Sequence, residues 1–168
     1  MNDDIEFDLE KFKAAVHYLI SKCNFKDNVE RTVLYELLYF SDFDCYEINE
    51  EAITGEKYIK KPRGPLPIHF TDAVLELKNE GKIQIHRQDR SDYVRYRYSS
   101  ACNPDISSLE DGELELIDEV VDRFSDLNSD EISRYSHGDF PWRLAKDDSE
   151  LNYEAVFYRE PEYSVRVY

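Results

Sequence analysis

The amino-acid sequence predicts an α+β fold, a mainly helical single domain over residues 1–168 with a small β-hairpin or sheet. Apolar residues recur at helical spacing through most of the chain, and two segments between residues 83 and 98 alternate apolar with polar side chains. A length of 168 residues and an aromatic fraction of 14% suit one domain with its own core. A helix followed directly by a hairpin is also the layout of a winged helix, so a wing-like middle third is one form that this fold can take.

Two long helices are expected in the N-terminal third. The first begins at residue 9, and its apolar face is Phe12, Val16, Leu19, Ile20 and Cys23. After a short break at residues 24–28, the second begins near residue 29, and its apolar face is Val33, Leu34, Leu37, Leu38 and Phe43. Gly55 then allows a turn, because glycine adopts positive φ without strain.

The middle of the chain reads as a turn, a helix and a hairpin. Tyr58 and Ile59 suit a short strand, but Gly64-Pro65 and Pro67 favour a turn rather than regular strand pairing. A helix follows from Phe70 to Gly81. The alternation that comes after it, with Tyr96 and Tyr98 on the inward face, predicts the hairpin.

Short helices are expected in the C-terminal third. Ser107 and Glu110 have the spacing of a capping box before an apolar helical stripe that runs to Phe124. A second helix follows from Ser129, and a last helical turn starts at Pro141. The tail over residues 147–168 alternates weakly, as a strand or a docking segment would, and we leave it unassigned.

The charge is unevenly distributed along the sequence. The formal net charge is -16, but residues 55–103 hold 10 Lys/Arg against 6 Asp/Glu, a local +4. Residues 1–54 hold 5 against 13, and residues 104–168 hold 6 against 18, which gives -8 and -12. A field this negative repels nucleic acid and attracts basic proteins.

No residue pattern indicates a catalytic or cofactor site. The histidines and cysteines lack the HxxxH or CxxC spacing of a metal site, and no GxSxG segment marks a nucleophile. The basic turn with Lys60, Lys61, Arg63 and Gly64 lacks the repeated glycines and the GK[ST] ending of a phosphate loop. We therefore expect no enzyme, no cofactor and no metal.

The sequence indicates a cytoplasmic protein with no membrane segment. No apolar run reaches the length of a membrane span, and the acidic start MNDDIEFDLE is unlike a signal peptide. Cys23, Cys45 and Cys102 are an odd, widely spaced set that we expect to be reduced and mostly buried. The oligomeric state is left open by these patterns.

Nucleic-acid contact is a secondary hypothesis for the hairpin. Its arginines could grip phosphates while tyrosines stack on bases. These arginines are Arg87, Arg90, Arg95 and Arg97. The opposing interpretation, a solvated basic face over buried Tyr96 and Tyr98, agrees better with the net charge.

Four segments in series resemble the Panacea domain, the SocA-like antitoxin family. They are LYELLYFSDFDCYE, AITGEKYIKKPRGPLP, LEDGELELIDEVVDRFSDLNSDEIS and YSHGDFPWRLA, and the resemblance covers about residues 10–146. Leu66 stands where the family commonly has valine, and the basic cluster around Arg63 is stronger than the family pattern suggests.

The resemblance implies a mainly helical fold around a small β element and no catalytic residues. It also implies a protein-binding antitoxin with a cognate toxin as partner, and some relatives look like adaptors that deliver the toxin to a protease. We expect the toxin to contact the turn and the last motif. The candidate residues are Tyr58, Lys60, Lys61, Arg63, Gly64, Pro65, His137 and Trp142. A DNA-binding regulator and a protease adaptor remain the alternatives.

Overall fold

A computed structural model describes residues 2–166, and it confirms the mixed α+β class. Its helices in chain order are α1 (Leu9–Cys23), α2 (Arg31–Asn49), α3 (Phe70–Asn79), α4 (Asp111–Phe124), α5 (Ser129–Ser136), α6 (Phe140–Leu144) and the 3-10 helix η1 (Tyr153–Tyr158). The strands are β1 (Tyr58–Lys61), β2 (Gly64–Pro67), β3 (Ile83–Asp89) and β4 (Val94–Ser100). The strands form two separate antiparallel pairs, β1–β2 and β3–β4, and the structure does not show a winged-helix arrangement.

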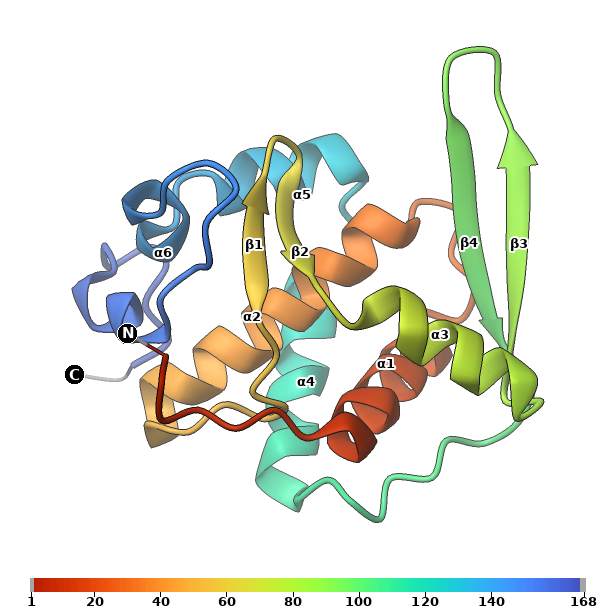
Figure 1. Ribbon diagram of the computed structural model, residues 1–168, viewed down its shortest axis with the longest axis horizontal. Coiled ribbons are helices and arrows are strands. Elements are labelled where there is room, and N and C mark those ends of the chain that lie inside the picture. The colour runs from red at the N-terminus through yellow and green to blue at the C-terminus, as the bar shows by residue number, and fades with distance from the viewer. Residues whose placement is uncertain (1, 167–168) are drawn as a thin grey trace.

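Helix α2 runs through the centre of the molecule (Figure 1) and is buried on nearly every side. It packs against α1, α4, α5, β2 and η1. A helix with neighbours all round needs apolar or paired polar side chains on each face. This explains why its sequence combines many aromatic residues with buried carboxylates at Glu36, Asp42, Asp44 and Glu47.

Strand β2 corrects the expectation of an irregular turn. Pro65 and Pro67 lie within the strand, opposite Lys60 and Tyr58 of β1. A strand at the edge of a sheet can hold proline, because the missing N–H would point away from the partner strand. The segment 148–151 lies along the other edge of β1, where Lys60 N donates to Ser149 O and Leu151 N donates to Tyr58 O.

The hairpin β3–β4 is confirmed and projects beyond the helices (Figure 1). Tyr98 is buried and contacts Phe70 of α3 edge-on. The cap of α4 differs from the expectation, since the capping box is formed by Glu110 and Glu113 rather than by Ser107 and Glu110. The tail forms η1 and docks on α2 instead of adding a strand within the described residues.

Candidate partner-binding site

The motif AITGEKYIKKPRGPLP takes part in a buried hydrogen-bond network with α2. Asp42 of α2 accepts from Thr54 N at 2.7 Å, from Thr54 Oγ1 at 2.6 Å and from the Tyr58 hydroxyl at 2.6 Å. Burial raises the pKa of Asp42 to about 6, although these hydrogen bonds act to lower it. Thr54 and Tyr58 therefore serve to satisfy a carboxylate inside the core.

The start of the chain fits closely over this motif. Gly55 has φ +74, and a Cβ there would lie 2.0 Å from the carbonyl oxygen of Glu6. Asp8 N donates to Thr54 O at 2.9 Å. Only glycine allows the two backbones to approach this closely.

The β1–β2 turn carries most of the predicted partner-binding residues, and few of them are open to solvent. Tyr58 is fully buried, and Gly64 and Pro65 are buried with it. Lys60 lies over the Trp142 ring at 4.9 Å and donates to the carbonyl of Trp142 at 3.0 Å. Arg63 is exposed at the tip.

The last motif lies beside that turn. The rings of His137 and Trp142 stack at 4.4 Å with 7° between their planes, and Trp142 is 7% exposed. Burial and then the nearby Lys60 lower the pKa of His137. The structure thus brings Lys60, His137 and Trp142 together as one layered cluster, while Lys61 pairs at the surface with Asp148 at 2.8 Å.

A buried carboxylate lies directly beneath the turn. Glu36 is fully buried, and its Oε1 accepts from Ser136 Oγ at 2.9 Å. Burial raises the pKa of Glu36 well above its ordinary value. Gly64, at φ +149, faces it so closely that a Cβ would lie 2.2 Å from Glu36 Oε1.

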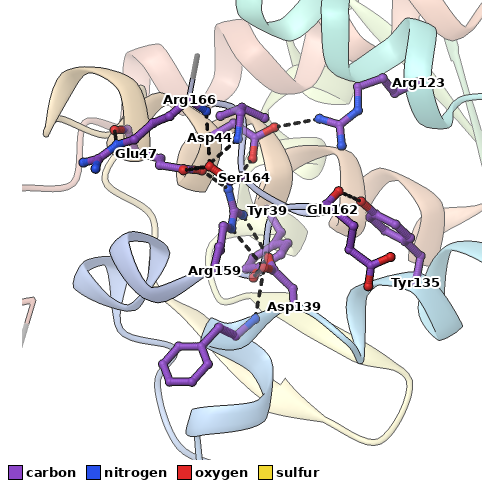
Figure 2. Close-up of polar contacts among 12 residues, drawn as sticks. Tyr39, Asp44, Glu47, Arg123, Tyr135, Asp139, Arg159, Glu162, Ser164 and Arg166 are labelled. Atoms are coloured by element: carbon purple, nitrogen blue, oxygen red, sulfur yellow. Dashed lines mark hydrogen bonds and ion pairs between the residues drawn. The ribbon is translucent and has the colours of Figure 1, made fainter. Parts of the chain in front are cut away.

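A buried arginine joins the tail to the motif region (Figure 2). The Arg159 guanidinium donates to Asp44 at 2.8 Å, to Glu47 at 2.9 Å and to both oxygens of Asp139 at 2.9 and 2.8 Å. Tyr39 also donates to Asp139 at 2.7 Å. Burial acts to lower the pKa of Arg159, but Asp44 and Asp139 hold it well above its ordinary value.

Sequence reasoning missed this ion network, because Arg159 lies in the tail that carries no motif. Asp44 and Asp139 both sit inside recognisable motifs, and two carboxylates between buried aromatic residues call for a cation. The need of these two carboxylates for a cation was the sequence signal that could have revealed the network. It did not identify which of the arginines would supply the positive charge.

The hairpin arginines are mostly engaged within the protein. Arg95 pairs with Glu30, and Arg97 lies over the Phe25 ring at 3.8 Å while donating to the Phe25 carbonyl at 2.7 Å. Arg87 pairs with Asp89 on its own strand at 3.3 Å. Arg90 is exposed near the tip. These contacts fix the loop after α1 against the hairpin.

Within residues 2–166, no cluster of three His, Cys, Asp or Glu side chains is arranged to hold a metal ion. None of the described helices combines the length and apolar character needed to cross a bilayer.

The chain matches the model of a known protein family. The family model described as antitoxin SocA-like, Panacea domain, matches residues 34–143. No curated protein and no solved structure matches. The matched range begins on α2 and ends on α6, so it includes the Asp42 network, the β1–β2 turn and the His137–Trp142 stack.

Proposed function

Because the chain belongs to the SocA-like Panacea family of antitoxins, we propose that it neutralises a cognate toxin by direct binding. The family match over residues 34–143 is the observation that carries this proposal. We further propose that the protein acts by occupying the toxin rather than by chemistry. The formal net charge of -16 supports a basic toxin as the partner.

The side chains proposed for toxin contact divide into two groups. Lys61 and Arg63 are exposed and can touch a partner directly. Tyr58, Gly64 and Trp142 are buried, so we propose that they shape the turn from beneath. Replacing a buried member would then change binding together with stability, whereas Arg63→Ala would change binding alone.

Co-expression with the adjacent gene tests the proposal. The neighbouring product should arrest growth when expressed alone, and growth should return when this chain is present. The two proteins should also purify as a complex. A neighbour that is harmless alone, or that stays toxic beside this chain, would refute the proposal.

Regulation of transcription is the weaker alternative. Three of the four candidate arginines already have carboxylate or backbone partners, which leaves Arg90 as the member with an exposed, uncommitted side chain among the described residues. Protein that fails to shift its own promoter DNA at low salt would exclude this alternative, because phosphate contacts are strongest there.

Delivery of the toxin to a protease is the other alternative. It predicts toxin levels that rise when the protease is removed.

A further inference from the structure

An apolar groove lies between the start of the chain and α3, and none of its lining residues belongs to the four family-like segments. We call residues 2–8 the N-terminal strap; it runs along the molecule into α1 (Figure 1). The groove has a volume of about 560 Å³ and is lined by Phe7, Leu9, His69 and Leu75, with Asp72 and Glu76 among the polar residues at its side. Leu9 is 37% exposed and Leu75 is 46% exposed, so two leucines on neighbouring helices face solvent at one place.

The floor of this groove is fixed in position. The rings of Phe7 and His69 stack at 4.0 Å with 11° between their planes. His69 is held by buried Glu56, whose carboxylate hydrogen-bonds with the ring Nδ1 at 2.6 Å and with the backbone N–H of His69 at 2.8 Å. A surface that is already ordered loses little conformational entropy when a partner binds.

The other side of the strap is strongly acidic. A second hollow of about 620 Å³ begins there and shares Phe7 and Leu9 with the apolar groove. Its carboxylates are Asp4, Glu6, Asp8, Glu10, Glu50 and Glu51. Within residues 2–166 none of these six carboxylates has an ion-pair partner. Lys11, the basic residue in the lining, forms its ion pair with Glu113 at 2.7 Å.

We propose that this composite surface is a second docking surface for the toxin, in addition to the β1–β2 turn, and that it accepts a basic amphipathic helix of the toxin; the inference rests on the proposed function. The apolar face of the helix lies in the groove between Leu9 and Leu75, in the manner of helix-in-groove recognition. Lysine or arginine side chains on its flank reach over the strap to the unpaired carboxylates. The apolar contact supplies affinity, and the charges supply orientation and rate.

Charge selects this occupant over the other candidates. A second copy of the chain would bring the same acidic hollow and another formal charge of -16 to the contact. A nucleic acid would bring phosphates against six carboxylates. A basic protein segment is the partner whose charge complements both hollows.

The apolar half of the site is tested with one substitution in the groove and one control substitution elsewhere on the surface. Leu75→Arg places a cation in the groove, whereas Val94→Arg places one at a 37% exposed valine of β4. Strand β4 begins near the tip of the hairpin that projects beyond the helices (Figure 1). Against the adjacent-gene product made by cell-free translation, Leu75→Arg should weaken binding at least tenfold and Val94→Arg by less than twofold. Thermal unfolding of both variants confirms that each is folded.

The acidic half of the site is tested with two triple variants that have the same net charge. The triple variant Asp4→Lys, Glu6→Lys, Glu51→Lys and the control triple Glu115→Lys, Glu119→Lys, Asp122→Lys both raise the formal charge by 6. The control side chains are exposed on α4. The strap triple should slow association at least fivefold more than the control, because only it removes local complementarity.

The outcomes separate this inference from the proposed function. A wild-type chain that does not bind the adjacent-gene product refutes the proposed function. If the wild type binds and Leu75→Arg binds as Val94→Arg does, the groove is not a toxin interface and the proposed function stands. A crosslink to the toxin from a photoreactive residue at position 75, absent at position 94, supports the groove directly. A crosslink between two copies of this chain at position 75 overturns it.

Discussion

Polar residues of the family motifs act mainly inside the protein. Asp42 is satisfied by Thr54 and Tyr58, although a motif rich in hydroxyl and carboxyl groups resembles a surface site when only the sequence is known. Trp142 also lies mostly inside the protein: Lys60 lies over its ring, the His137 ring stacks on it, and it is 7% exposed. The chemistry of these motifs is hydrogen-bond satisfaction, which buried polar groups require.

Gly64→Ala should destabilise the fold by about 3 kcal/mol or more, because the new Cβ meets a buried carboxylate and glycine alone tolerates this φ. Gly81→Ala is the control: Gly81 also has positive φ, at +74, but a Cβ there meets nothing within 4 Å. It should cost about 1 kcal/mol. Urea unfolding measures both, and equal losses would show that Glu36 moves aside.

Asp42 should make stability fall as the pH rises from about 4 to 6. Its pKa is raised from 3.8 to about 6, so over this window the unfolded chain releases a proton that the folded chain retains. The free energy of unfolding then decreases by roughly 3 kcal/mol on account of this group. Asp42→Asn removes the titration while other buried acids remain.

Urea unfolding of wild type and Asp42→Asn at several pH values checks this expectation. The two stability curves should converge or cross as the pH rises, with the variant gaining relative to the wild type. Parallel curves would show that Asp42 does not titrate in this range.

At the scale of elements, the C-terminal segment is an integral part of the helical layer. Arg159 reaches Asp44 and Glu47 on α2 and Asp139 before α6 (Figure 2). The segment continues past Glu47, where Val165 N donates to the carboxylate at 3.1 Å. One buried cation therefore links α2, the start of α6 and the tail.

Arg159→Met should destabilise the protein by about 3–5 kcal/mol, because it leaves buried Asp139 and Glu47 without a cation and Asp44 with only the more distant Arg123. Amides of residues 153–166 should lose hydrogen-exchange protection first. Arg143→Met is the control, since Arg143 is 51% exposed and lies 3.9 Å from Glu160. It should change stability by less than about 0.5 kcal/mol. Retained protection in Arg159→Met would show that apolar packing alone holds the tail.

Elements with local sequence signals could be predicted, and those that depend on distant partners could not. The spacing of Phe12 to Cys23 and the alternation at Tyr96 and Tyr98 gave the first helix and the hairpin. Strand β2 was missed because Pro65 and Pro67 argue against pairing unless the strand lies at an edge, which only the tertiary fold decides. Arg159 was missed because its partner Asp44 lies 115 positions away.

The candidate surfaces show the same division. Composition predicted an acidic protein suited to a basic partner, but the proposed groove combines Leu9 with Leu75 from separate helices. No spacing in the sequence joins these two residues. Their exposure emerges only when α1 and α3 pack side by side.

For the molecule as a whole, a formal charge of -16 should govern how quickly it finds a basic toxin. The association rate should fall about tenfold or more between roughly 0.05 and 0.5 M salt, because the Debye length shortens and steering is lost. The dissociation rate should change much less, since it depends on the close contacts. Stopped-flow mixing at several salt concentrations measures both, and an association rate that ignores salt would contradict electrostatic steering.

The Arg159 network also bears on how the partner should be sought. A fragment trimmed to the family match at residue 143 would lose the guanidinium and retain Asp44, Glu47 and Asp139 around an empty pit. Such a pit would take lysine and arginine side chains from any basic protein, whichever surface the intact chain uses. Screens with the trimmed fragment would then collect false partners that mimic an antitoxin complex, so the intact chain is the appropriate bait.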